Sequence, residues 1–246
     1  MNRSTTLLSV HSVTRSFGSL RAVNELSFEV AEGEIVGLLG PNGSGKTTMM
    51  NLVSGALKPD SGSIRLGDDE ISGLAPNRIA RQGIARTFQL VRVLASMDCL
   101  DNVKAGMAFG NTPLWGAAAD ARATELLGLV GISHHVDTLG QDLTYMNQKR
   151  LELARALALQ PRLLLLDEWL AGLNPSELVE AIALLRKVRD EGVTMVMVEH
   201  VMDAIRSLCG RCVIMNAGSK IAEGTPTQAL AEPEVIRAYL GDDDDA

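Results

Sequence analysis

The segment from Gly40 to Thr47 constrains the fold of this chain more than any other. It reads G-P-N-G-S-G-K-T and fits the pattern G-x-x-x-x-G-K-[ST], between an apolar run at 34–39 and a helical pattern at 46–56. A loop between a buried strand and the start of a helix presents backbone N–H groups to an anion, and its glycines allow close approach. The segment therefore predicts a phosphate site in an α/β fold.

The side chains of this loop have separate expected roles. We expect Lys46 to place its charge on the terminal phosphates of a nucleotide and the Thr47 hydroxyl to bind Mg²⁺. The predicted nucleotide-binding residues of the loop are Asn42, Gly43, Ser44, Gly45, Lys46, Thr47 and Thr48.

A second run, Leu163 to Glu168, consists of four leucines followed by two carboxylate residues. Neighbouring residues of a strand point to opposite sides, so Asp167 can hold Mg²⁺ while Glu168 polarises the attacking water. A solvated strand end is the alternative interpretation. His200 follows another apolar run, at 193–198, and would alone be interpreted as structural. With the phosphate loop, the carboxylates predict binding and hydrolysis of a nucleoside triphosphate.

Composition limits the function classes. The 246 residues carry a net charge of −7, and an acidic chain is a poor candidate for general nucleic-acid binding, so no nucleic-acid partner is predicted. No apolar run reaches the roughly 18–20 residues of a membrane span, which favours a cytosolic chain that can still dock on a membrane protein. Three cysteines suggest a reducing compartment. Cys209 and Cys212, a lone C-x-x-C, are interpreted as packed thiols.

Apolar periodicity predicts one α/β nucleotide-binding core that a helical segment interrupts. Strands alternate with helices, which predicts a mostly parallel sheet, and runs with one solvated face near the N-terminus predict an antiparallel β subdomain. The expected core is 1–89 with 160–241, the helical subdomain is 90–159, and 242–246 form an acidic tail. Expected strands are 7–14, 26–30, 34–39, 61–66, 163–166, 194–198 and 212–215; expected helices are 46–56, 98–108, 117–130, 148–159 and 176–189. His134 and His135 are expected in a loop without partners.

The motif order resembles the ATP-binding subunit of ABC transporters over residues 7–241. The resemblance implies ATP and Mg²⁺ as cofactors. It also implies that Phe17 stacks on adenine with Val23 beside it, that Gln89 contacts Mg²⁺ and water, and that His200 contacts the γ-phosphate. Leu143–Arg150 matches the signature segment and Ala171–Asn174 the D-loop. The residues expected to face the ATP of a second subunit are Thr144, Tyr145, Met146, Asn147 and Asn174. The resemblance makes Glu168, His200, Gln89 and Lys46 the expected catalytic set, and Thr47, Gln89 and Asp167 the metal set.

A finer resemblance is to importers of branched-chain and other hydrophobic amino acids, or of urea and short amides. It rests on Gly83–Gln89, Leu143–Tyr145, Ala171–Pro175, Val198–His200 and Ala238–Gly241. The implied partners are a second ATP-binding subunit, two membrane permease subunits and, indirectly, an extracytoplasmic solute-binding protein. The implied location is the cytoplasmic face of the inner membrane, where the chain is held through the permease. Because the permease and the binding protein select the substrate, this chain leaves the substrate open.

The signature segment departs from the family pattern. The family reads L-S-G-G-Q, or L-x-Y-G-Q in this branch, whereas this chain reads L-T-Y-M-N at 143–147. Met146 is expected to add bulk where glycine allows a close approach to the opposite ATP. This motivates a hypothesis of unequal ATP sites, in which the partner is a different chain with an intact signature and restoring Gly and Gln raises turnover. If the chain instead pairs with a second copy of itself, both sites carry the defect and ATP hydrolysis is expected to be slow. Trp169 replaces a usual proline, and Asn174 stands where many relatives carry Asp.

The stretch at 90–102 is expected to transmit movement to the membrane. Its apolar side chains, Val91, Val93, Leu94 and Met97, form either a groove for a cytoplasmic permease helix or ordinary core of the helical insert. Three other functions stay open: an ABC ATPase without a membrane partner, a nucleotide switch with low turnover, and the ATPase subunit of an exporter.

Overall fold

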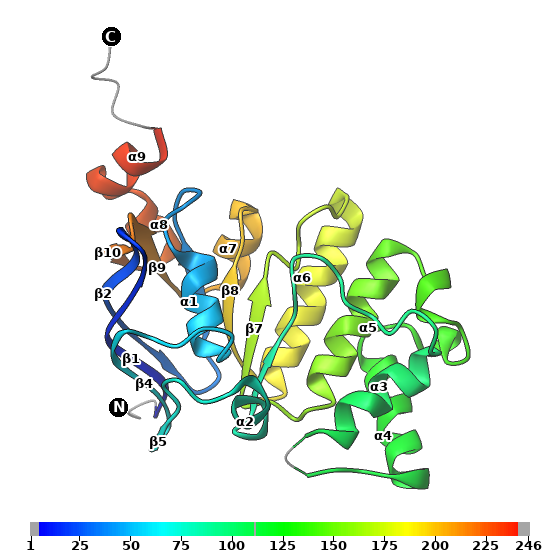
Figure 1. Cartoon of the computed structure of the whole chain (residues 1–246). Coiled ribbons are helices and arrows are strands. Elements are labelled where there is room, and N and C mark those ends of the chain that lie inside the picture. Colours follow the sequence, from blue (N-terminus) through cyan, green and yellow to red (C-terminus); the bar gives the residue numbers. More distant parts are fainter. Residues whose placement is uncertain (1–4, 111, 241–246) are drawn as a thin grey trace.

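The computed structural model describes residues 5–110 and 112–240, which form two sheets and surrounding helices (Figure 1). The larger sheet has the strand order β10-β9-β3-β8-β7-β6. Its strands are β3 (Ile35–Leu39), β6 (Ile84–Arg86), β7 (Leu163–Asp167), β8 (Thr194–Val198), β9 (Arg211–Asn216) and β10 (Ser219–Gly224). All neighbours in it are parallel except β9 and β10, which confirms the predicted mostly parallel sheet.

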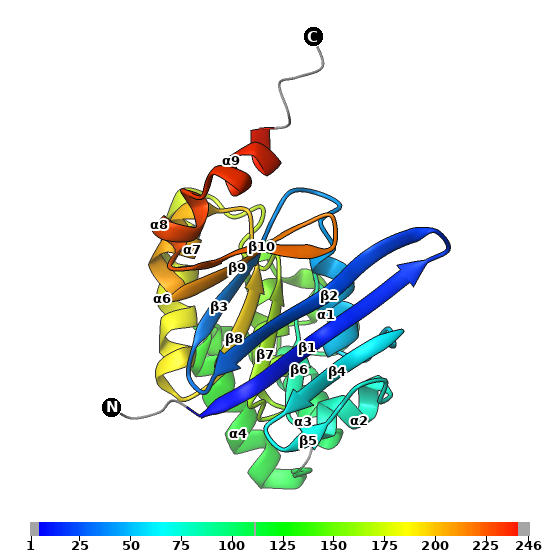
Figure 2. The ribbon, with the colours of Figure 1, turned by 90° about the vertical axis from the view of Figure 1, so that its left-hand side faces the viewer.

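The smaller sheet is antiparallel and has the order β2-β1-β4-β5. Its strands are β1 (Thr6–Phe17), β2 (Leu20–Ala31), β4 (Ser61–Leu66) and β5 (Asp69–Glu70). β1 and β2 are longer than predicted, because register shifts between Val10 and Val13 break the alternation without ending the pairing. The turn between them places Gly18 at φ 61°. Figure 2 shows this long hairpin crossing in front of the larger sheet.

One helix lies between the two sheets, and three others form a separate helical group. Helix α1 (Lys46–Val53) packs between the two sheets, against β2 and β7. Helices α3 (Cys99–Ala108), α4 (Gly116–Leu129) and α5 (Tyr145–Leu157) follow β6 in the chain, precede β7 and pack on one another. The remaining elements are α2 (Pro76–Arg81), η1 (Ser133–His135), η2 (Gly140–Asp142), α6 (Pro175–Asp190), α7 (Met202–Leu208), α8 (Pro226–Leu230) and α9 (Pro233–Leu240).

Helix α5 begins three residues before the predicted start at 148. Thr144 is the reason, because its hydroxyl accepts a hydrogen bond from the Asn147 amide (3.4 Å) and caps the helix. The two thiols of the C-x-x-C pair are free and buried and lie against Gly37 of β3, as predicted. Within the described parts of the chain, no helix is long and apolar enough to cross a membrane.

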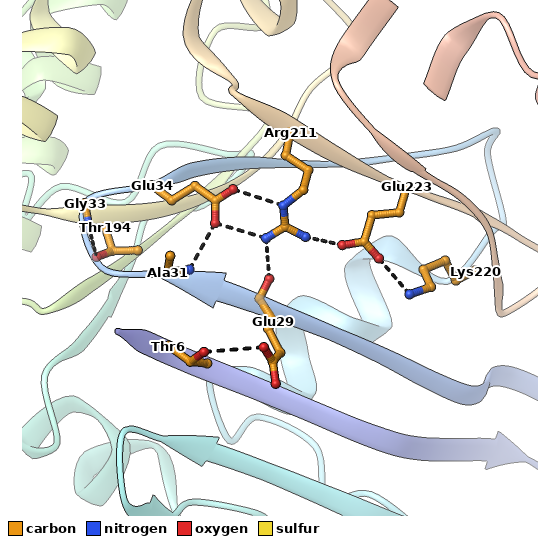
Figure 3. A network of polar contacts seen from close by, with 9 residues as sticks. All are labelled: Thr6, Glu29, Ala31, Gly33, Glu34, Thr194, Arg211, Lys220 and Glu223. Carbon is orange, nitrogen blue, oxygen red and sulfur yellow. Dashed lines mark hydrogen bonds and ion pairs between the residues drawn. The ribbon is translucent and has the colours of Figure 1, made fainter. Parts of the chain in front are cut away.

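Arg211 of β9 connects the two sheets (Figure 3). Its guanidinium donates twice to the Glu34 carboxylate, at 3.0 Å each, and once to the backbone oxygen of Glu29 in β2 (2.6 Å). Glu223 of β10 also pairs with it and in turn accepts from Lys220 (2.7 Å). Two-point Arg–carboxylate pairs fix geometry as well as adding energy, so this network holds β2 against β9 and β10.

Candidate nucleotide site

The phosphate loop runs from β3 into α1, and its backbone shape requires glycine. Gly45, the residue before the helix, has φ 103°, and a Cβ there would lie 2.3 Å from the Ala22 oxygen. A Cβ on Gly40 would lie 2.1 Å from the Met215 oxygen. A Cβ on Gly43 would meet nothing within 4 Å, so the space beside it is open. Neighbouring backbone therefore fixes the loop from one side and leaves the other free for a ligand.

A cavity of about 380 Å³ opens beside this loop. That volume is within the range of small-molecule sites. Its lining residues are Phe17, Leu20, Arg21, Ala22, Asn42, Gly43, Ser44, Gly45, Lys46, Thr47, Thr48, Glu168, His200 and Ala217. The fold thus brings the whole predicted phosphate loop together with the expected aromatic residue, the expected base and the histidine.

Phe17 lies at the edge of this cavity, with 45% of its surface exposed and the Arg15 guanidinium 5.0 Å from the ring centre. Val23 does not line the cavity as expected. Its side chain is fully buried in the core between the sheets, because alternation along β2 turns it inward. Leu20, Arg21 and Ala22 take its place, and sequence analysis did not select them.

Lys46 is buried and lies against its own loop. Its ammonium donates to the backbone oxygens of Gly40 (2.7 Å) and Pro41 (2.9 Å). Burial lowers the pKa of this amine, while the nearby charges of Glu168 and Asp167 act in the opposite direction. A phosphate oxygen is a stronger hydrogen-bond acceptor than a carbonyl oxygen, so the Lys46 ammonium is placed to leave these carbonyls and donate to a bound phosphate.

Glu168 lies between Gln89 and His200, two of the three other predicted catalytic residues. The Gln89 amide donates to one carboxylate oxygen (2.8 Å), and Nε2 of His200 lies 3.3 Å from the other. The three follow β6, β7 and β8, at the carboxyl ends of adjacent parallel strands. Glu168 has φ 50°, a conformation that is unfavourable without glycine and is found mainly at functional sites.

Asp167 forms a buried ion pair that sequence analysis missed. Its Oδ2 accepts from Arg86 (2.7 Å), and the same guanidinium donates to Asn51 (2.7 Å) on α1 and to Ser54 (3.0 Å), the residue after that helix. The pair uses one carboxylate oxygen and leaves Oδ1 outside it. The sequence pointed to this ion pair only through the position of Arg86, three residues before Gln89, and that position does not identify Asp167 as its partner.

The donor set fits Mg²⁺. Thr47, Asp167 and Gln89 offer a hydroxyl, a carboxylate and an amide oxygen, and Mg²⁺ takes oxygen ligands, using one or two carboxylates together with substrate phosphates. In the parts of the chain that the structure describes, no three His, Cys, Asp or Glu side chains gather as a complete metal site. The protein residues alone therefore match a metal that shares its coordination with a nucleotide.

Comparisons with known proteins agree with this geometry. A family model described as "ABC transporter" matches residues 23–171, and one described as "Branched-chain amino acid ATP-binding cassette transporter" matches 219–245. The chain belongs to the ABC transporter family of ATP-binding subunits. ATP is therefore its nucleotide, and ATP hydrolysis is its reaction.

Relatives and solved structures cover nearly the full length. LivG of Escherichia coli strain K12, a "high-affinity branched-chain amino acid transport ATP-binding protein", is 40% identical over 96% of this chain and 98% of its own. LptB of the same organism, a "lipopolysaccharide export system ATP-binding protein", is 36% identical with the same coverage of both chains. The ADP-bound ATP-binding cassette MJ1267 superposes with a TM-score of 0.87, at 27% identity, over 96% of this chain and 99% of that one.

The signature segment differs from the expectation at Met146. This side chain is only 7% exposed and packs in the core under α5, so it does not project toward a partner. The expected steric bulk is therefore absent, because the second residue of the helix turns inward. Tyr145, in contrast, is about half exposed and lies beside Gly172 of the D-loop.

His135 has partners, so the prediction that it has none is wrong. Its Nε2 accepts from the Asn147 amide (3.1 Å), and its Nδ1 lies 3.2 Å from the Thr138 hydroxyl. The short helix η1 brings the histidine to the start of α5. Asn147, which replaces the family glutamine, is therefore held from the side by a residue twelve positions earlier. The His134 ring lies 4.2 Å from the His135 ring, centroid to centroid, with the two planes tilted by 42°, and His134 is otherwise exposed.

Asn174 caps helix α6. Its side chain accepts from the Glu177 amide (3.0 Å), while the Glu177 carboxylate accepts from the Asn174 amide (2.9 Å). This reciprocal arrangement satisfies two backbone donors at the start of the helix. The structure thus gives Asn174 a local role, and its expected contact with a second subunit stays a prediction.

The segment after Gln89 is held by two buried polar residues. The Glu152 carboxylate of α5 accepts from the Arg92 amide (3.0 Å). The Asn102 side chain accepts from the Leu94 amide (2.8 Å) and donates to three backbone oxygens at 2.9–3.0 Å. Val93 packs against the core, whereas Leu94 and Met97 are more than a third exposed. Val93 therefore fits the interpretation as ordinary core, whereas Leu94 and Met97 lie at the surface, where a permease helix could bind.

Leu94 and Phe109 line a second cavity, of about 330 Å³, which residues of α3, α5 and the end of β6 also line. Phe109 is 76% exposed, and Leu90, four residues before Leu94, is 80% exposed. Exposed apolar side chains of this size beside a cavity are typical of a surface that a partner covers.

Glu199, which precedes His200, gives the stability of the protein a pH dependence. Burial raises the pKa of its carboxyl from 4.5 to about 7, with Glu168 adding to the rise and the Leu170 amide opposing it. The folded protein then keeps a proton that the unfolded chain releases above pH 4.5. The stability from this group is complete below that pH and is lost as the pH rises through about 7.

We expect Glu199→Gln to remove this dependence. The shift corresponds to about 3 kcal/mol, so the variant should gain up to that amount in unfolding free energy relative to wild type between pH 5 and pH 8. Urea unfolding at several pH values measures this. The exposed substitution Glu125→Gln on α4 serves as the control. A constant difference between the Glu199 variant and wild type at all pH values would contradict the raised pKa.

Proposed function

We propose that this chain is the ATP-hydrolysing subunit of an importer for branched-chain or other hydrophobic amino acids. The observation that carries the proposal is the similarity to LivG over nearly the full length, together with the match of residues 219–245 to the branched-chain family model. The similarity to LptB favours export as a second candidate, but that relative is less identical than LivG.

The chemistry follows from the cavity. Glu168 acts as the base that takes a proton from the attacking water, and Gln89 and His200 hold its two carboxylate oxygens. Lys46 and the loop amides bind the phosphates, and Phe17 stacks on the adenine. Thr47, Asp167 and Gln89 would hold Mg²⁺, which neutralises charge on the phosphates when bound. His200 donates to the γ-phosphate oxygens as charge develops there.

Coupling to transport needs a second ATP-binding subunit, whose signature segment completes the site at Lys46. We propose that this subunit is a different chain, because the signature of this one carries Asn147, bonded to His135, where the family has glutamine. Two permease subunits and a solute-binding protein complete the transporter at the cytoplasmic face of the membrane. Residues 90–159 would move as one unit against the core, 1–89 and 160–241. ATP closes the pair only while the γ-phosphate is present.

ATP-driven uptake of radiolabelled leucine into vesicles that contain the assembled transporter tests the proposal. Uptake that requires ATP and stops with Glu168→Gln is the expected result. ATP hydrolysis without uptake of any hydrophobic amino acid, together with stimulation by a lipid substrate, would favour the export candidate.

The exposed apolar surface around Leu94 is the proposed contact for the permease. Leu94→Glu should reduce leucine uptake by about tenfold or more, because a charge in an apolar contact costs several kcal/mol. The ATPase rate of the isolated chain should stay within about twofold of wild type, since Leu94 lines no part of the nucleotide cavity. Val179→Glu, at an exposed position on α6, is the matched control and should change neither rate. Equal losses of uptake and ATPase with Leu94→Glu would argue against a docking role.

A further inference from the structure

The peptide group between Trp169 and Leu170, one residue beyond Glu168, is held at both ends by buried ionisable side chains. Its carbonyl oxygen accepts from the Lys149 ammonium (2.7 Å). Its N–H donates to the Glu199 carboxyl (2.7 Å). Lys149 is fully buried and Glu199 is 2% exposed. A cation at the oxygen and a carboxyl group at the N–H both favour the orientation of the peptide dipole.

The three parts of this arrangement come from three functional segments. Lys149 lies on the signature helix α5, Glu199 directly precedes His200, and the peptide group lies one residue beyond Glu168. The Trp169 indole N–H returns a hydrogen bond to the Lys149 oxygen (3.3 Å). A proline at 169 would lack that donor. Trp169, whose presence the family pattern does not explain, therefore supplies a second hydrogen bond between the signature helix and the catalytic segment.

The burial of Lys149 is costly. Among the described residues no carboxylate lies within 4 Å of its ammonium; its contacts include the Trp169 oxygen and the Tyr145 ring, 5.0 Å away. Its charge opposes part of the rise that burial causes in the pKa of Glu199. A fully buried lysine without a direct ion pair lowers stability unless its hydrogen bonds are well made. Glu168, one residue away from the peptide group, also has the unfavourable φ of 50° and needs neighbours that hold it.

We propose that Lys149 and Glu199 are positioning residues, which hold the Trp169–Leu170 peptide group and thereby fix the carboxylate of Glu168. The inference rests on the proposed role of Glu168 as the base. Because α5 also begins with the signature segment at Thr144–Asn147, the same helix would connect the ATP site of the second subunit to the base in this chain. Displacement of the signature end would then change the position of Glu168 through Lys149.

The test is steady-state ATP hydrolysis by the transporter assembled with full-length Lys149→Met, with assemblies of wild type and of Lys104→Met beside it. Lys104 is a surface lysine of α3 that pairs with Asp101 and Asp120, so its substitution removes the same group without contact to the site. The expected result is a kcat lowered by about tenfold to a hundredfold, the loss typical of a misplaced catalytic group. KM, and ATP binding in the presence of EDTA, should change by less than about threefold, because Lys149 does not line the nucleotide cavity. Circular dichroism confirms that each variant is folded. A folded Lys149→Met with wild-type kcat would overturn the proposal.

A double-mutant cycle with Glu199→Gln asks whether both residues act through one peptide group. If they do, the double variant is about as slow as the slower single variant, because residues that act as a unit are not additive. Losses that multiply would mean separate roles and would overturn the proposal. If Lys149→Met does not fold, Trp169→Phe replaces it in the cycle. That variant keeps the carbonyl but loses the indole N–H, and a folded form with unchanged kcat would also count against the proposal.

Glu168→Gln, measured in parallel, distinguishes failure of the proposed role of Glu168 from failure of the positioning role of Lys149 and Glu199. If Glu168→Gln hydrolyses ATP at the wild-type rate, the proposed role of Glu168 fails and this inference with it. If Glu168→Gln is inactive while the Lys149 and Glu199 variants turn over normally, only the positioning role fails.

Discussion

Glu168→Gln should lower the kcat of ATP hydrolysis by about 10²–10⁴-fold while ATP still binds, because the amide keeps the size of the side chain but cannot take a proton from water. Its oxygen can still accept from Gln89, so the local hydrogen bonding is largely kept. Phosphate release at saturating ATP measures the loss. ATP binding, followed by the quenching of a fluorescent analogue or by calorimetry, shows that the cavity is intact.

The matched control for that experiment is Glu180→Gln, an exposed glutamate on α6 that pairs with Arg150 at the surface. It should turn over at the wild-type rate. If Glu168→Gln keeps more than about a tenth of wild-type turnover, another group is the base. If folded wild-type chain binds ATP and does not hydrolyse it, a second, different ATP-binding subunit is required for activity.

Met146→Gly should destabilise the fold by about 3–5 kcal/mol without raising ATP turnover. The substitution removes a buried side chain from the core under α5 and leaves a cavity, and glycine in a helix adds a smaller loss. Urea unfolding measures the change in the free energy of unfolding. The family pattern alone led to the opposite expectation, a faster enzyme, because it treated the methionine as exposed bulk.

Ala118→Gly separates the two parts of that loss. Ala118 is exposed on α4, so this variant should lose only about 1 kcal/mol, the helix preference of alanine over glycine. If Met146→Gly were as stable as Ala118→Gly and hydrolysed ATP faster than wild type, the methionine would have to project toward the partner site.

The features that could be predicted from the sequence are those in which neighbouring residues determine the geometry. The phosphate loop is set by glycine spacing within eight residues, and Glu168 is placed by the buried strand directly before it. Parallel neighbours then bring Gln89 and His200 to the same edge, which the strand and helix alternation already implied.

Features that depend on which way a side chain turns could not be predicted. Val23 and Met146 point into the core because of the pairing of β2 and the packing of α5, and neither is encoded within a few residues. The contacts of Arg86 with Asp167 and of Lys149 with Trp169 join positions 81 and 20 apart, respectively. Single-sequence patterns report period and spacing, so they name the elements but not these pairs.

The Arg211 network has a consequence for how tightly ATP can be held. Phe17 belongs to the antiparallel sheet and the phosphate loop follows a strand of the parallel one, so residues from two separate sheets line the nucleotide cavity. By bonding β9 to Glu29 of β2 and to Glu34 beside β3, Arg211 fixes the separation between those sheets before ATP arrives. A site whose halves are already at the required spacing loses little conformational entropy on binding. We therefore expect the affinity for ATP to depend partly on Arg211, although this side chain does not line the cavity.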